Sequence, residues 1–254
     1  MPNTLRVEPG PVTRITLARP EVRNAINAQL IRELRAELEQ LQAQPPRVLV
    51  LAGEGAMYCA GADVNWMAET GQLGWDENYV DALAMADLLA ALNGLPFPVL
   101  ACVQGGAYGG GIGFLACCDA VVCADDASFA FGEVKLGLAP ATIAPYVIAK
   151  IGVSAARELM LSADRFDAWR AESVGLVHQV VAAVDLDTVV SERAERYLKA
   201  GPQAVQATKS LIAKLSPYLA VHREETARLI AELRASEEGR EGLTAFLEKR
   251  RPNW

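Results

Sequence analysis

Glycine is unusually dense in one short segment of this chain, and that segment limits the folds open to it. In GGAYGGGIGFLACCD, residues 105–119, glycine occupies six of the first nine positions, and the sequence then becomes apolar. Glycine loses more conformational freedom on folding than any other residue, so such a cluster needs a reason in the folded chain. The apolar segment FPVLACVQ, residues 97–104, directly precedes it and is typical of a strand. We therefore expect a strand, a tight glycine turn and a short buried helix.

Apolar strand segments alternate with helical segments along the first three quarters of the chain. RVLVLAG, residues 47–53, has the continuous apolar character of a parallel strand. Residues 24–44 have the spacing of an amphipathic helix, with Asn24 as its expected N-cap. This alternation predicts an α/β core over residues 1–195, and the helical pattern that follows predicts a C-terminal helical region over residues 196–254.

Composition argues against several classes of function. The net charge of −7 does not favour a nucleic-acid partner. No apolar run has the length of a membrane span, and the N-terminal segment MPNTLRVEPG lacks the pattern of a secretion signal, so we expect a cytoplasmic protein. The five cysteines include no C-x-x-C pair and the chain has only two histidines, so we expect reduced thiols and no metal site.

The glycine cluster by itself allows more than one interpretation. GIGFLA, residues 111–116, formally matches the dinucleotide fingerprint, with Glu133 at the distance of its acidic residue. That fingerprint opens a full helix followed by a strand, whereas two short strands follow here. Alternatively, N–H groups at the start of a helix hold a developing oxyanion, which requires bare backbone. A tight packing turn is the third interpretation.

A second segment favours the oxyanion interpretation. CAGADV, residues 59–64, also follows a strand and opens a helix for which Asp63 is the expected cap. Two junctions of this kind can bring two backbone N–H groups onto one oxygen. Loss of one such donor typically lowers a rate by about 10²–10³.

Four segments that span nearly the whole chain together resemble the crotonase, or enoyl-CoA hydratase, superfamily. They are ARPEVRNAIN (18–27), GEGAMYCAGADVNWM (53–67), VQGGAYGGGIGFLACCDAVVCADDASFAFGEVKLGLAP (103–140) and AFLEKRRP (245–252). The resemblance implies the ClpP/crotonase-like spiral of ββα units. It also implies C-terminal helices through which members form homotrimers or dimers of trimers.

The same resemblance implies an acyl-CoA thioester as substrate, with coenzyme A as part of that substrate and no separate cofactor. The thioester carbonyl is expected between the N–H groups of Ala62 and Gly110. The remaining coenzyme A contacts are expected from the loop backbone at Ala60, Ala62, Asp63 and Val64, and from two cations, Arg23 and Lys249. A neighbouring subunit would supply Lys249. Ordinary surface charge is the alternative for both cations.

Glu133 is the expected catalytic acid–base. It interrupts the otherwise apolar segment SFAFGEVKLGLAP, where desolvation would raise its pKa toward the range useful for proton transfer. The alternative from the residues alone is a turn acid paired with Lys135. The resemblance favours catalysis, because Glu133 matches the second catalytic glutamate of family hydratases. We expect His178 to be structural and His222 to face solvent.

Position 113 departs from the family pattern. Typical hydratases carry a glutamate there, in G-G-G-x-E, whereas this chain has Gly113. Isomerases that shift a Δ3 double bond to Δ2 often keep only the Glu133 equivalent, so isomerisation is an alternative to hydration. A third alternative, an RNA-binding or scaffold protein without activity, is disfavoured by the acidic charge.

Finer similarity indicates the subgroup of 3-methylglutaconyl-CoA and carboxygeranoyl-CoA hydratases of leucine and terpenoid catabolism. It lies in residues 59–67, 132–152 and 162–181. The small residue at 113 would leave space for a branched acyl group. Lys135 or Arg165 would pair with a substrate carboxylate, and the candidates for a second acid are Glu69, Asp76 and Glu77.

Overall fold

The computed structural model describes residues 4–216 and 223–253. Its largest element is a six-stranded sheet with the order β1-β2-β3-β4-β6-β9. All neighbouring strands are parallel except β1 and β2, which are antiparallel. The strands are β1 (Leu5–Glu8), β2 (Val12–Leu17), β3 (Val48–Gly53), β4 (Val99–Val103), β6 (Ala120–Ala124) and β9 (Gln179–Val181).

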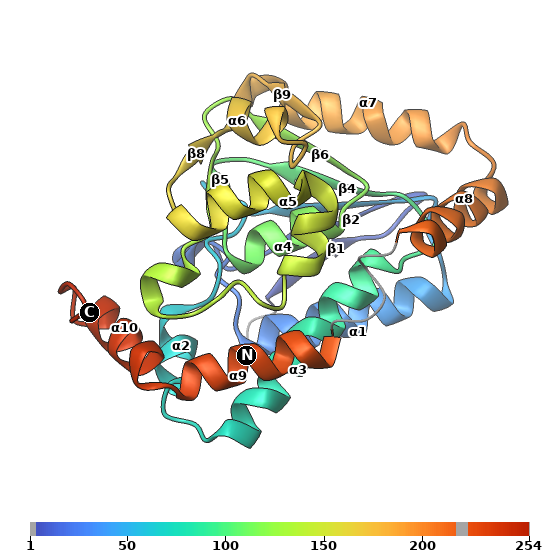
Figure 1. Cartoon of the computed structure of the whole chain (residues 1–254). Helices are drawn as coiled ribbons and strands as arrows, with labels where there is room; N and C mark the ends of the chain where they lie inside the picture. The colour runs from blue at the N-terminus through green and yellow to red at the C-terminus, as the bar shows by residue number, and fades with distance from the viewer. Residues whose placement is uncertain (1–3, 217–222, 254) are drawn as a thin grey trace.

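Both faces of this sheet are covered, which explains why its central strands are apolar throughout. In β3, Val48 and Val50 belong to one buried cluster, together with residues of α7 (Leu186–Leu198). Leu49 and Leu51 belong to a larger cluster on the opposite face. Figure 1 shows α7 along one side of the sheet, with α4 and α5 on the other side.

The larger cluster is formed with the helices α1 (Ala28–Ala43), α3 (Trp75–Asn93), α4 (Gly110–Cys117) and α5 (Ala144–Ser162). The predicted cap of the first helix is wrong, because Asn27 caps it by accepting a hydrogen bond from the Leu30 N–H at 2.9 Å. Asn24 instead has φ +56° and donates from Nδ2 to the carbonyls of Glu54 and Met57. It therefore holds a loop rather than a helix end.

A second, three-stranded sheet carries the residues that follow the glycine turn. It has the order β5-β7-β8, with β5 (Gly106–Tyr108), β7 (Ser128–Ala130) and β8 (Phe166–Asp167). The short 3-10 helix η2 (Glu133–Leu136) follows β7. The other short elements are η1 (Pro20–Val22), α2 (Val64–Thr70), α6 (Ala168–Ser173) and η3 (Ala183–Asp185).

Three helices form the end of the chain: α8 (Pro202–Leu215), α9 (Arg223–Ala235) and α10 (Glu237–Leu247). Helix α9 packs along α3, and α10 packs against both α2 and η2. Figure 1 shows α9 and α10 in red, beside α3 and α2. Helices α9 and α10 therefore cover the side of the core on which α2, α3 and η2 lie. The division at residue 195 stays a prediction.

Candidate active site

The two glycine junctions predicted from the sequence lie next to each other. The Tyr108 N–H donates to the Cys59 carbonyl at 3.0 Å, and the Cys59 N–H donates to the Gly106 carbonyl at 3.4 Å. Residues 59 and 107 form a parallel bridge. The loop after β3 therefore runs beside β5, so the two glycine turns of the chain are adjacent.

One backbone N–H group next to each of the two predicted donors is engaged in a hydrogen bond. Asp63 donates to the Ile26 carbonyl at 2.8 Å, and Gly109 donates to the Ala130 carbonyl at 3.0 Å. Within residues 4–216 and 223–253, neither the Ala62 N–H nor the Gly110 N–H has a hydrogen-bond acceptor. Gly110 is the first residue of α4, where N–H groups lack partners within the helix and the helix dipole favours negative charge.

Two glycines in these turns cannot be replaced without strain. Gly61 has φ +86°, and a side-chain carbon there would lie 2.9 Å from the Tyr108 carbonyl oxygen. Gly109 has φ +46°, and a side-chain carbon there would lie 3.0 Å from Glu133 Oε1. The first contact shows why the two loops can approach each other closely. The second shows that the Glu133 carboxyl group lies against the backbone next to Gly110.

The Glu133 carboxyl group is held in an apolar position at the start of η2. Its Oε2 is buried and has no hydrogen-bond partner among the described residues. Burial raises the pKa of Glu133 to about 7, against a smaller lowering effect of its own backbone N–H. A carboxyl group with this pKa can both accept and return a proton near neutral pH.

Lys135 does not pair with Glu133, so the alternative of a surface ion pair is wrong. Its Nζ donates to the Ala163 carbonyl at 2.7 Å and lies 3.8 Å from Asp164 Oδ1. The other proposed cation, Arg165, is exposed, with its guanidinium carbon 5.5 Å from the ring centroid of Tyr108.

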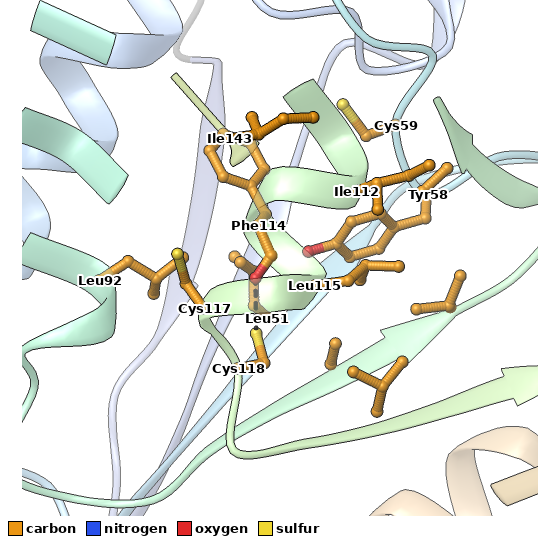
Figure 2. Close-up of a cluster of buried hydrophobic side chains, with 14 of the residues drawn as sticks. Leu51, Tyr58, Cys59, Leu92, Ile112, Phe114, Leu115, Cys117, Cys118 and Ile143 are labelled. Carbon is orange, nitrogen blue, oxygen red and sulfur yellow. Dashed lines mark hydrogen bonds between the residues drawn. The ribbon is translucent and has the colours of Figure 1, made fainter. Parts of the chain in front are cut away.

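The space at Gly113 is filled by protein, which corrects the expectation of room for a branched acyl group there. A side-chain carbon at 113 would overlap the Ile143 side chain and lie 3.4 Å from Leu89 Cδ2. Ile143 is 2% exposed and belongs to the cluster around α4 that Figure 2 shows. A glutamate at 113 would require this cluster to repack.

The candidates for a second acid lie elsewhere. Glu77 accepts a hydrogen bond from the Gly74 N–H at 3.1 Å and so caps α3. Asp76 and Glu77 line an open groove of about 520 Å³ between α1 and the start of α3. Glu69 is exposed on α2. Glu133 is thus the carboxyl group that the geometry associates with the glycine turns.

The predicted coenzyme A residues fall into two groups. The Ala60 N–H donates to the Arg23 carbonyl at 2.9 Å, and the Asp63 N–H donates to the Ile26 carbonyl. Both N–H groups are therefore used in hydrogen bonds within the protein. Asp63 caps α2 as predicted, by accepting from the Asn65 N–H at 2.9 Å. The side chain of Arg23 and residue Val64 are exposed beside this loop.

Lys249 is exposed just beyond the end of α10. Its predicted phosphate contact would involve a neighbouring subunit and stays a prediction, as do the roles of the other site residues.

An ion pair that the sequence analysis missed fixes the same loop. Arg19 Nη2 lies 2.8 Å from Asp63 Oδ2, and Nη1 donates to the Ala25 carbonyl at 2.5 Å. Both side chains of the ion pair are largely buried. The only signal in the sequence was the presence of Arg19 in the ARPEVRNAIN segment.

His178 has a structural role, as expected. Its Nδ1 accepts a hydrogen bond from the Val121 N–H at 3.0 Å. Burial, and to a smaller degree the nearby cations, lowers the pKa of His178 to about 4. The other histidine, at position 222, lies outside the described residues.

The thiols are buried and do not form a metal site. All five cysteines are free and buried, and burial raises the pKa of Cys59, Cys118 and Cys123 to about 12. Over residues 4–216 and 223–253, no group of three His, Cys, Asp or Glu side chains could hold a metal ion. In the same ranges, no helix is both long enough and apolar enough to span a bilayer.

The chain is similar to known proteins over nearly its whole length. The family described as enoyl-CoA hydratase/isomerase matches residues 8–254. The enoyl-CoA isomerase/hydratase fer4 of Mycosarcoma maydis is 32% identical over 256 residues, which cover 95% of this chain and 91% of the relative. A solved enoyl-CoA hydratase from Mycobacterium avium is 34% identical with a TM-score of 0.87, and the match covers 100% of both chains. Another, from Shewanella pealeana ATCC 700345, is 36% identical with a TM-score of 0.82, covering 99% of this chain and 96% of that one.

The chain therefore belongs to the enoyl-CoA hydratase/isomerase family. The match to solved structures of the family confirms the predicted crotonase fold. Enzymes of this family act on acyl-CoA thioesters, and this chain is one of them.

Proposed function

We propose that this enzyme hydrates a 2-enoyl-CoA and that Glu133 is the single acid–base of the reaction. The observation that carries the proposal is the position of the Glu133 carboxyl group, which lies against the Gly109 backbone, one residue before the Gly110 N–H. A substrate carbonyl held by the N–H groups of Ala62 and Gly110 would bring its reacting carbons close to this carboxyl group.

In the proposed reaction, Glu133 as carboxylate takes a proton from water while the water oxygen forms a bond to C3. The π electrons of the C2–C3 double bond move onto C2 and the thioester oxygen, where the two N–H groups stabilise the negative charge. Glu133 then returns the proton to C2, and a 3-hydroxyacyl-CoA results. A pKa of about 7 leaves a large fraction of the carboxyl group ionised at neutral pH and lets it act in both directions.

Isomerisation of a 3-enoyl-CoA is the second candidate, and the packing at position 113 favours it. Because Ile143 fills the space beside Gly113, no second carboxyl group can be placed there without repacking. One carboxyl group is sufficient to take a proton from C2 and return it to C4, which moves the double bond without adding water.

For the acyl group we propose a branched or carboxylated chain, such as that of 3-methylglutaconyl-CoA, with a place in leucine breakdown. The support is the similarity in residues 59–67, 132–152 and 162–181 to hydratases of that subgroup. The space for the branch lies elsewhere than at position 113, where the protein core is closed.

The test is to incubate the purified protein with 3-methylglutaconyl-CoA, crotonyl-CoA and a 3-enoyl-CoA, and to separate the products by liquid chromatography with mass detection. Gain of one water by the branched substrate supports the proposal. A new peak of unchanged mass from the 3-enoyl-CoA supports isomerisation instead. If none of the three thioesters reacts, both candidate reactions are wrong for these substrates.

A further inference from the structure

Ile26 connects the two backbone segments that carry the N–H groups of Ala62 and Gly110. The Ile26 N–H donates to the Gly61 carbonyl at 2.7 Å, and the Ile26 carbonyl accepts from the Asp63 N–H at 2.8 Å. These two partners are the residues on either side of Ala62. The Ile26 backbone therefore fixes the peptide units around residue 62 without using the N–H of that residue.

The side chain of Ile26 extends to the second donor. A side-chain carbon at Gly110 would lie 2.9 Å from Ile26 Cδ1 and 3.4 Å from Met85 Cε. Ile26 is 1% exposed, so its side chain is enclosed by protein. As a β-branched residue it is also stiff at χ1, whereas a methionine side chain adapts easily. Ile26 is thus the rigid one of the two side chains in contact with Gly110.

We propose, resting on the function proposed above, that Ile26 is a positioning residue that sets the separation of the Ala62 and Gly110 N–H groups. It makes hydrogen bonds to the backbone on both sides of one donor and is in van der Waals contact with the other. Two donors stabilise one oxyanion only when both reach it at hydrogen-bond distance. A shift of about 1 Å in such an arrangement can lower a rate by about 10²-fold.

The experiment compares Ile26→Val, which removes only Cδ1, with the matched control Ile15→Val. Ile15 is 0% exposed in the middle of β2 and loses the same group, and it is not among the nearest atoms to a side-chain carbon placed at any glycine of the two turns. Three quantities are measured on each full-length variant: kcat, KM, and the carbonyl stretching frequency of bound butyryl-CoA by difference infrared spectroscopy. Butyryl-CoA is saturated, so it reports polarisation of the thioester without reacting.

We expect Ile26→Val to lower kcat by about tenfold with KM changed by less than about threefold. The carbonyl frequency of its bound thioester should move back toward the frequency in water. Ile15→Val should keep the kcat and the carbonyl frequency of the unmodified enzyme, although both variants lose a buried methylene.

Ile26→Val with unchanged kcat and an unchanged carbonyl frequency would overturn the proposal. If that variant does not fold, Ile26→Leu, which retains the number of carbons and alters their placement, is measured in the same way against the same expectations. An unmodified enzyme that neither lowers the carbonyl frequency of bound butyryl-CoA nor turns over any enoyl-CoA would instead contradict the proposed function.

Discussion

The carboxyl group of Glu133 lies directly against the backbone of Gly109, since a side-chain carbon at Gly109 would be 3.0 Å from Glu133 Oε1. This relationship places an acid with an upward-shifted pKa beside the first residue of α4. It also ties the chemistry of the site to a glycine with φ +46°. The proposed activity, its pH dependence and part of the stability of the fold all depend on it.

The pH dependence of turnover follows from the pKa of Glu133. As a base, Glu133 must be ionised in the free enzyme, so kcat/KM for hydration should rise with pH and reach half its maximum at about pH 7. The measurement is a series of initial rates between about pH 5 and about pH 9, with a thioester that the enzyme turns over. A rate already close to its maximum at about pH 5, as expected for a base with the ordinary pKa of an exposed glutamate, would contradict the raised pKa of Glu133.

Replacement of this acid should stabilise the fold at high pH. The pKa of Glu133 is raised from 4.5 to about 7 in the folded protein, so folding is opposed when the carboxyl group ionises. The folded state binds more protons than the unfolded state between these values, and stability falls as pH rises through this window. Glu133→Gln should therefore unfold at a higher urea concentration than the unmodified protein at about pH 8, by an amount worth about 3 kcal/mol.

At about pH 4.5 the difference in stability should largely disappear, because the carboxyl group is then neutral in the folded state and half neutral in the unfolded state. Glu69→Gln, at an exposed position on α2, is the matched control and should change neither value. Equal effects of the two substitutions would contradict the buried environment assigned to Glu133.

Introducing a glutamate at position 113 should disturb the core. The new side chain would overlap Ile143, so Gly113→Glu should destabilise the protein by about 1–3 kcal/mol in urea unfolding. The additional substitution Ile143→Ala makes room and should recover part of that loss. Gly201→Ala is the control, since a side-chain carbon there has only the Ala204 Cβ within reach, at 3.9 Å. Full stability of Gly113→Glu alone would show that the core around α4 repacks freely.

From the exposed apolar residues of helix α8, we predict that the chain associates with copies of itself. Its residues Leu211, Ile212 and Leu215 are 56%, 59% and 72% exposed and follow one another along the helix. A contiguous exposed apolar surface of this kind favours an interface. We expect a homotrimer, or a dimer of trimers, in light scattering after size exclusion. The triple change of these residues to Ser, Gln and Ser should reduce the measured mass to that of a monomer, and an unchanged mass would place the interface elsewhere.

Local patterns predicted the parts of the site that depend on neighbouring residues. The cap at Asp63 follows from its place before α2, and the burial of Glu133 follows from the apolar segment around it. Asn24 was misplaced because its side chain is bonded to Glu54 and Met57, about thirty residues later in the chain, and no local pattern encodes this.

Contacts between distant segments also explain what the sequence did not reveal about the glycines. The sequence pattern indicates space for substrate at Gly113, but the residue that fills that space, Ile143, directly precedes α5. The contact between Ile26 and Gly110 likewise joins residues far apart in the chain. Such contacts form because the fold brings distant segments together, so no local sequence pattern predicts them.

The role of Glu133 in hydration is tested most directly by turnover of 3-methylglutaconyl-CoA and crotonyl-CoA in water labelled with heavy oxygen, by the unmodified enzyme and by Glu133→Gln. We expect the unmodified enzyme to place one labelled oxygen on the acyl chain of at least one substrate. We expect Glu133→Gln to do so about 10²–10⁴-fold more slowly, with little change in KM. A Glu133→Gln variant that incorporates label at the full rate would contradict the role given to Glu133.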